Sequence, residues 1–137
     1  MTNTTYDFIV IDDDPINNMV CKASIKASSG GKVPVCFTNP VEGLKYLENE
    51  YITLAGTNPI ILFLDINMPQ MSGFELLEKY YHFPPEAKKN ITIFMLSSSV
   101  NPEDIDRARA NPDVKEYLYK PLNKEKVLKV LESLSIT

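Results

Sequence analysis

Five short apolar runs alternate with stretches of helical periodicity, and this alternation limits the possible fold more than any other feature of the sequence. The runs cover residues 8–11, 33–37, 60–64, 91–96 and 114–118. Those at 60–64 and 91–96 are apolar almost throughout, which is typical of central parallel strands that helices cover on both faces. A chain that alternates strands with helices is expected to form a doubly wound α/β fold. We therefore expect one parallel sheet of five strands, with five helices on its two faces.

The domain organisation follows from length and composition. A chain of 137 residues is long enough for one hydrophobic core, and no shift in composition divides it. We expect a single domain over residues 1–137 that stands alone, without an output domain. The longest predicted connections cover residues 50–59 and 83–90, and the sequence gives no role for the first of them.

Each predicted helix begins with a local start signal. Asp14 precedes Pro15 at the first helix, and the others open at Asn39, at Ser72 or Gly73, at Asn101 and at Asn123. We expect the first helix to turn an apolar stripe toward the sheet, formed by Ile16, Met19, Val20 and Ala23. The corresponding stripe of the third helix consists of Phe74, Leu77, Tyr80 and Tyr81, and we expect this helix to stop at Pro84 and Pro85.

Charge and cysteine content exclude several classes of protein. The formal net charge of −4 and the lack of a dense basic cluster argue against nucleic acid or an anionic membrane as a partner. The sequence contains neither a signal peptide nor an apolar stretch of membrane-spanning length. Cys21 and Cys36 do not form a CxxC pair, so we interpret them as reduced structural thiols. These features predict a cytoplasmic protein.

Polar residues follow the predicted strands at the point where each strand ends. Three consecutive acids, residues 12–14, follow the first strand, and Asp65 follows the third. The fourth strand ends at Ser97, and the fifth ends at Lys120. Ligands of a doubly wound sheet bind outside the carboxyl ends of its strands. We therefore expect carboxylates, a hydroxyl and a lysine to meet at one rim.

Each of these residues also has a purely structural explanation. Asp14 is expected to cap the helix that follows it, Ser97 could be a turn residue, and Lys120 could be a solvated charge. The expected meeting of all these residues at one rim favours a functional site over these structural explanations. Clustered carboxylates need a neutralising partner, and an oxygen-only cluster suits Mg²⁺. A carboxylate can itself become an aspartyl phosphate, which a cation, a lysine and a hydroxyl would stabilise.

Four segments in this order resemble the receiver domain of two-component response regulators, the CheY-like superfamily. They are DFIVIDDDP, FLDINMPQMSGFELL, MLSSS and YLYKPL, and together they span nearly the whole chain. The resemblance implies the flavodoxin-like strand order 2-1-3-4-5. It also implies that Asp65 is the phosphoacceptor and a metal ligand. Asp13 would bind Mg²⁺ directly, Asp12 through water, and Asn67 through its main-chain carbonyl; Mn²⁺ or Ca²⁺ could substitute for Mg²⁺.

The same resemblance implies roles around the phosphoryl group. Ser97 would hydrogen-bond a phosphoryl oxygen, although threonine is commoner at this position. Lys120 would bind the phosphate, and its peptide bond to Pro121 would be cis. Asn67 and Ser99 match positions that tune dephosphorylation, and both are uncharged here.

A conformational switch and its partners are implied as well. Ser97 and Tyr117 match the switch positions, so Tyr117 would turn inward on phosphorylation. The responding face would consist of the helix after Asn101, the strand at 114–118 and the helix after Asn123. The donor would be a sensor histidine kinase or a histidine phosphotransfer protein. The chain would signal to a protein target, as a monomer or a phosphorylation-dependent dimer, and would have no separate turnover substrate.

Three alternatives remain open. The chain could be an intermediate of a phosphorelay, or a receiver-like binding module that is never phosphorylated. It could also be a phosphohydrolase of the haloacid-dehalogenase-like class, whose D-x-D pattern residues Asp12 and Asp14 fit. The phosphohydrolase is disfavoured because no acidic pair at a strand end follows Lys120.

Overall fold

The computed structural model describes residues 5–53 and 58–135, and its centre is a five-stranded parallel sheet. The strands are β1 (Asp7–Ile11), β2 (Val35–Phe37), β3 (Ile60–Leu64), β4 (Ile91–Ser97) and β5 (Val114–Tyr119). Their order is β2-β1-β3-β4-β5, and every neighbouring pair is parallel. The predicted α/β class and the strand order 2-1-3-4-5 are therefore confirmed.

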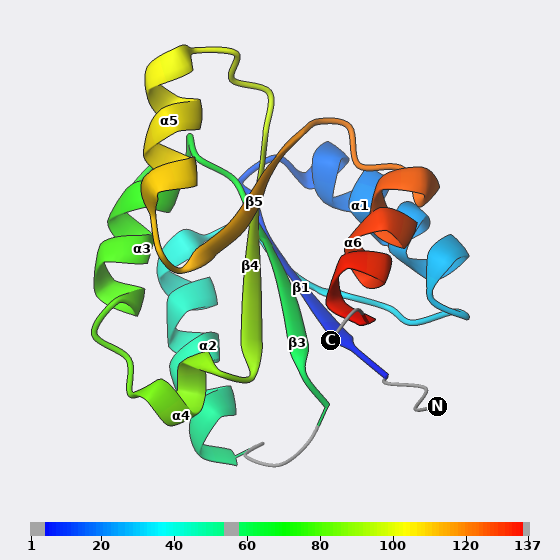
Figure 1. Ribbon diagram of the computed structural model, residues 1–137, viewed down its shortest axis with the longest axis horizontal. Coiled ribbons are helices and arrows are strands. Elements are labelled where there is room, and N and C mark those ends of the chain that lie inside the picture. The colour runs from blue at the N-terminus through cyan, green and yellow to red at the C-terminus, as the bar shows by residue number, and fades with distance from the viewer. Residues whose placement is uncertain (1–4, 54–57, 136–137) are drawn as a thin grey trace.

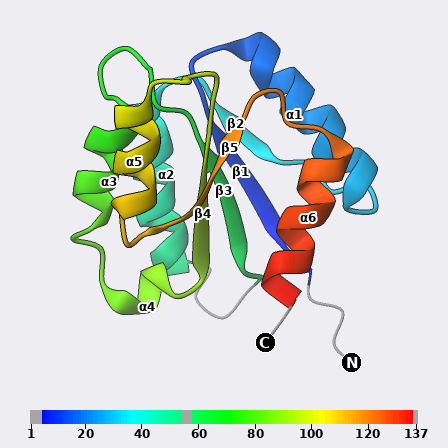
Figure 2. The ribbon, with the colours of Figure 1, turned by 45° about the horizontal axis from the view of Figure 1, so that its top comes forward.

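Helices cover both faces of the sheet (Figures 1 and 2). Helices α1 (Pro15–Ser28) and α6 (Lys124–Ser135) lie on one face. Helices α2 (Pro40–Thr53), α3 (Gly73–Tyr80) and α5 (Pro102–Ala110) lie on the other. None of the helices in the described part of the chain is both long enough and apolar enough to span a membrane.

The described residues contain six helices, so the expected number of five is wrong. The additional helix, α4 (Pro85–Lys88), lies in the connection predicted for residues 83–90. Pro85 occupies its first turn, where proline is favoured because the missing N–H would have no partner there. Helix α2 also continues to Thr53, so the connection predicted to begin at residue 50 starts later. Residues 54–57 of that connection lie outside the described residues.

Two hydrophobic cores hold the layers together, one on each side of the sheet. Odd-numbered residues of β1, such as Ile9 and Ile11, pack with α2, α3 and α5, and even-numbered ones, such as Phe8 and Val10, pack with α1 and α6. This alternation follows from the two-residue period of a strand. The fully buried β3 supplies side chains to both cores.

Helix α1 is rotated relative to the expectation from its apolar pattern. The predicted inward residues Ile16 and Met19 are 71% and 69% exposed, and Val20 and Ala23 are exposed as well. The buried residues of this helix are Asn17, Asn18, Cys21 and Ile25. Both asparagines donate hydrogen bonds to Asp12. Because the buried Asp12 requires hydrogen-bond donors, the face of the helix that carries these asparagines turns inward.

The prediction for α3 is correct except at its end, since the helix stops at Tyr80 and does not continue to the two prolines. Phe74, Leu77 and Tyr80 are buried, whereas Tyr81 is 60% exposed. Tyr81 is the C-cap residue, and its side chain contacts Lys88 of α4, whose ammonium lies 5.0 Å from the ring centre. The helix that follows the double proline therefore gives Tyr81 a partner outside the core.

Candidate functional site

Strand pairing brings the predicted site residues to one rim of the sheet. Ile11 of β1 pairs with Leu64 of β3, so Asp12 and Asp65, which follow them, emerge side by side. Ser97, the last residue of β4, pairs with Tyr119 of β5, directly before Lys120. The backbone N–H of Lys120 donates to the carbonyl oxygen of Ser97 at 2.9 Å. The Lys120–Pro121 peptide bond that follows is cis.

Asp65 is buried at the centre of this rim and is only 6% exposed. Its Oδ1 accepts the backbone N–H of Ile66 at 2.8 Å and lies 3.5 Å from the ammonium of Lys120. Its Oδ2 makes no hydrogen bond to the described residues. Burial and the charge of Asp12 raise the pKa of Asp65 to about 6, although Lys120 opposes the shift. At neutral pH most of this carboxyl group is still ionised.

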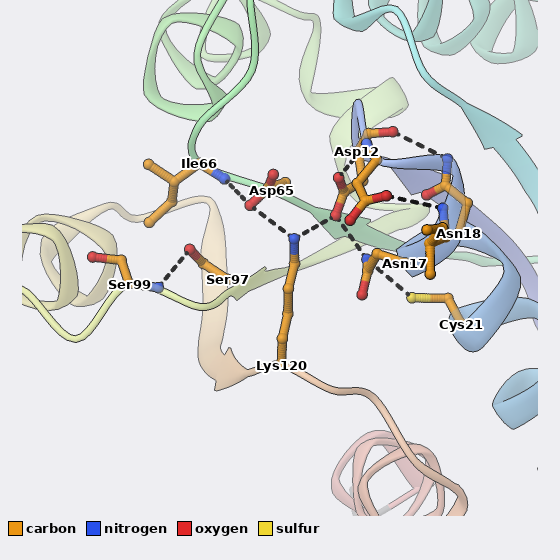
Figure 3. Close-up of polar contacts among 11 residues, drawn as sticks. Asp12, Asn17, Asn18, Cys21, Asp65, Ile66, Ser97, Ser99 and Lys120 are labelled. Atoms are coloured by element: carbon orange, nitrogen blue, oxygen red, sulfur yellow. Dashed lines mark hydrogen bonds and ion pairs between the residues drawn. The ribbon is translucent and has the colours of Figure 1, made fainter.

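Asp12 is almost completely buried and is surrounded by hydrogen-bond donors (Figure 3). Its Oδ2 accepts from the ammonium of Lys120 and from Nδ2 of Asn17, both at 2.7 Å. Its Oδ1 accepts the backbone N–H of Asp14 at 2.9 Å. A third side chain, that of Asn18, donates to the Asp12 carbonyl oxygen at 3.0 Å. These donors compensate for the desolvation of a buried carboxylate.

Lys120 lies between the two carboxylates but closer to Asp12. Figure 3 shows its ammonium between Asp65 on one side and Asp12 on the other. Burial lowers the pKa of Lys120, but the hydrogen bond to Asp12 and the charges of both aspartates outweigh burial, so the pKa is raised overall. Lys120 therefore remains a cation at physiological pH.

Three carboxylates are close enough together to share a cation. One oxygen from each of Asp12, Asp13 and Asp65 lies within 4.8 Å of the others. A donor set made only of oxygen suits a hard cation such as Mg²⁺, which binds one or two carboxylates and keeps several waters. The residues present thus fit the expected ion. Asn67 is exposed two residues after Asp65, and the role of its main-chain carbonyl stays a prediction.

The acidic triplet divides as expected. Asp14 is exposed, and its Oδ1 accepts the backbone N–H of Ile16 at 2.9 Å, which makes it the N-cap of α1. Of the three acids in the triplet, only Asp12 and Asp13 belong to the carboxylate cluster with Asp65.

The glycine that ends the segment FLDINMPQMSG, Gly73, has a physical explanation in the structure. Its N–H donates to the carbonyl oxygen of Ile66 at 2.8 Å, which closes the loop from β3 to α3 tightly. A Cβ atom at this position would collide with the carbonyl oxygen of Asp65. A glycine is therefore needed here because the backbone of residue 73 lies directly against the carbonyl group of Asp65.

A chain of hydrogen bonds leads from Ser97 to Tyr117. The hydroxyl oxygen of Ser97, which is buried, accepts the backbone N–H of Ser99 at 3.1 Å. The hydroxyl of Tyr117 donates to the carbonyl oxygen of Ser99 at 2.7 Å. The hydroxyl of Ser99 donates to the carboxylate of Asp104, also at 2.7 Å. Tyr117 is only 5% exposed, so its side chain is turned inward. Ser99 thus links the rim to both β5 and α5.

Asn17 and Asn18 are the site residues that the sequence reasoning missed. The apolar pattern of α1 predicted that the residues on either side of them, Ile16 and Met19, face the sheet. The available signal was the pair of adjacent amides one turn after three acids, because a buried carboxylate needs donors nearby.

Comparison with known proteins agrees with this geometry. The family model of the response regulator receiver domain matches residues 8–132. The probable C4-dicarboxylate response regulator DctR of Bacillus subtilis is 28% identical over 134 residues, which cover 96% of this chain and 53% of that protein. The chemotaxis protein CheY of Treponema pallidum is 27% identical, over 94% of this chain and 82% of that protein. The chain spans about half the length of DctR and most of CheY.

A solved structure supports the same assignment. A two-component response regulator from Cytophaga hutchinsonii superposes with a TM-score of 0.84 at 27% identity, covering 96% of this chain and 98% of that one. The match of the family model extends over most of the chain. This chain belongs to the response regulator receiver domain family of two-component signal transduction.

Proposed function

We propose that Asp65 accepts a phosphoryl group from a phosphohistidine of a partner protein, in a reaction that requires Mg²⁺. The observation that carries this proposal is the setting of Asp65. Its buried carboxylate has one oxygen without a hydrogen-bond partner among the described residues, beside a lysine and two further carboxylates. A nucleophile, a cation site and a fixed positive charge are what phosphoryl transfer needs.

The residues of the rim have different roles in the proposed reaction. Oδ2 of Asp65 forms the new bond to phosphorus while the nitrogen–phosphorus bond of the donor breaks, and the released imidazole takes up a proton. Lys120 and the Ser97 hydroxyl stabilise the phosphoryl oxygens. Asp13, Asp65 and the Asn67 carbonyl would hold Mg²⁺ directly. When bound, the ion supplies positive charge that offsets the charge of the phosphoryl group and the acidic cluster.

Phosphorylation would be read out through the chain from Ser97 to Tyr117. A phosphoryl oxygen that accepts from Ser97 would move this hydroxyl away from the N–H of Ser99. Ser99 is also hydrogen-bonded to Tyr117, so a movement of Ser97 would be passed on to Tyr117, and the population of Tyr117 would shift toward the inward position. The surface that changes would be formed by α5, β5 and α6, and we propose that a protein target binds there.

The exposed face of α1 supports a protein as the phosphoryl donor. Ile16, Met19 and Val20 are exposed on the helix that begins three residues after Asp12. Exposed apolar side chains that gather beside a functional site are typical of a surface that another protein covers. A histidine kinase or histidine phosphotransfer protein would bury this face while its phosphohistidine reaches Asp65.

The alternatives are less well supported. In a dehalogenase-like phosphohydrolase Asp12 would be the nucleophile, but three donors already occupy its carboxylate. A binding module that is never phosphorylated has no need of a free oxygen on Asp65. A phosphorelay intermediate would use the same chemistry. The stand-alone arrangement, the dimer and the cytoplasmic location stay predictions.

The proposal is tested by incubating the chain with a small phosphodonor, with Mg²⁺ or with a chelator, and measuring the intact mass. We expect one added phosphoryl group with Mg²⁺ and none with the chelator. The control is Asp65→Asn, which has the same shape but no nucleophile. The proposal is wrong if the wild-type chain gains no mass, or if the variant gains as much.

A further inference from the structure

Asn17 donates to the same carboxylate oxygen of Asp12 as Lys120 does. It is 8% exposed, and both hydrogens of its amide nitrogen are used. One hydrogen bond goes to Oδ2 of Asp12 at 2.7 Å, and the other goes to Sγ of the fully buried Cys21 at 3.6 Å. The reversed amide would place two oxygens against each other at Asp12, so these two contacts fix the orientation of Asn17.

The hydrogen bonds of Asp12 leave little of its carboxylate for a cation. A carboxylate has about four acceptor positions, two on each oxygen. Lys120 and Asn17 occupy both positions on Oδ2, and the N–H of Asp14 occupies one on Oδ1. One position therefore remains, and it is on Oδ1.

We infer that Asn17 is a positioning residue that blocks Oδ2 of Asp12 and thereby sets which divalent cation the site prefers. The inference rests on the cation site of the proposed function. With Oδ2 blocked, Asp12 can offer a cation or its water one oxygen only. Ca²⁺ takes about six to eight oxygen ligands and often binds carboxylates through both oxygens, whereas Mg²⁺ requires fewer ligands and keeps waters. Asn17 thus favours Mg²⁺ over Ca²⁺.

The neighbouring Asn18 provides a matched control. It lies on the same turn of α1, is 6% exposed and also donates to Asp12, but to the main-chain carbonyl and not to the carboxylate. Asn17→Leu and Asn18→Leu each remove a buried amide and keep the same number and branching of side-chain heavy atoms. Only the first frees a position on Oδ2. Asn17→Leu removes the hydrogen bonds to Asp12 and Cys21, and Asn18→Leu removes the one to the Asp12 carbonyl oxygen.

The experiment measures the dissociation constants of Mg²⁺ and Ca²⁺ for the unphosphorylated chain by titration calorimetry. We expect Asn17→Leu to raise the affinity for Ca²⁺ relative to Mg²⁺ by roughly tenfold, the lower end of the range for residues that contact metal ligands. Asn18→Leu should leave this ratio within about twofold of the wild type. If Asn17→Leu does not fold, Asn17→Ala serves in its place, since it frees the same position.

A spectroscopic readout separates this role from general destabilisation. The luminescence lifetime of bound Eu³⁺, an ion of the size of Ca²⁺, in light and heavy water reports how many waters it retains. Asn17→Leu should retain fewer waters than the wild type and Asn18→Leu the same number.

The two ideas fail in different ways. An unchanged cation ratio and an unchanged water count in Asn17→Leu, with normal binding by the wild type, overturn the role of Asn17 alone. An equal shift in Asn18→Leu overturns it as well. If the wild-type chain binds neither Mg²⁺ nor Ca²⁺, the cation site of the proposed function is wrong, and the inference fails with it.

Discussion

The buried Asp65 is expected to lower the stability of the chain when no cation is bound. Its pKa is raised from 3.8 to about 6, mainly by burial and by the charge of Asp12. One pKa unit corresponds to about 1.4 kcal/mol, so the ionised carboxylate costs about 3 kcal/mol of folding free energy. The folded chain holds this proton more tightly than the unfolded chain. The stability that the protonated Asp65 contributes is therefore fully present below about pH 4, and this contribution is lost as the pH rises through about 6.

The substitution Asp65→Asn removes this cost because the amide is neutral at every pH. In the presence of a chelator at pH 8, we expect the variant to be more stable than the wild type by up to about 3 kcal/mol. At pH 4 the two should differ little, since the wild-type carboxyl is then protonated. A chain of 137 residues gains about 2.1 cal/mol/K of entropy per residue on unfolding, so 3 kcal/mol corresponds to a rise in Tm of about 10 °C.

The assay is urea denaturation followed by circular dichroism, at pH 8 and at pH 4, with chelator throughout. Asp14→Asn is the control, because Asp14 is exposed and asparagine caps a helix equally well. Adding Mg²⁺ at pH 8 should stabilise the wild type more than Asp65→Asn. The reasoning is refuted if Asp65→Asn is no more stable than the wild type at pH 8, or if its gain is the same at both pH values.

Three further predictions concern the switch and the donor surface. Lys120→Ala should still accept a phosphoryl group from a small donor, but the NMR shifts that phosphorylation causes around Tyr117 should be lost; unchanged shifts would contradict the role of Lys120. Tyr117→Phe should lose about 1 kcal/mol of unfolding free energy, measured by denaturation, because the hydrogen bond to Ser99 disappears; no loss would mean that this bond is not formed. Met19→Lys, at an exposed position, should change stability by less than about 0.5 kcal/mol yet slow transfer from a protein donor, with phosphorylation by a small donor unchanged. Equal transfer rates from the protein donor would argue against docking on α1.

The sheet and the rim were predictable because strand ends carry their own signal. The carboxyl ends of parallel strands meet at one edge, so residues such as Asp12 and Asp65, which follow the adjacent strands β1 and β3, had to be neighbours once the order of strands was known. The division of the acidic triplet followed from a local rule, since Asp14 stands directly before a proline that begins a helix.

The rotation of α1 was not predictable from periodicity. Residues 16, 19, 20 and 23 form an apolar stripe, and Ile25 lies on a different face that includes Asn17 and Cys21. Apolar patterning favours the first face, but a buried carboxylate at Asp12 requires donors that only the second face supplies. That requirement depends on the burial of Asp12, which is a property of the folded chain. The close approach at Gly73 is likewise a property of the fold, because it depends on how tightly the loop after Asp65 closes.

The most direct test of the central claim is to locate the phosphoryl group on the chain. Borohydride reduces an acyl phosphate to an alcohol, so a phosphorylated aspartate is converted to homoserine, which peptide mass spectrometry can find. After incubation with a small phosphodonor and Mg²⁺, we predict conversion at Asp65 and no conversion when a chelator replaces Mg²⁺. Conversion at Asp12 or Asp13 instead, or equal conversion at Asp65 with the chelator, would contradict the account.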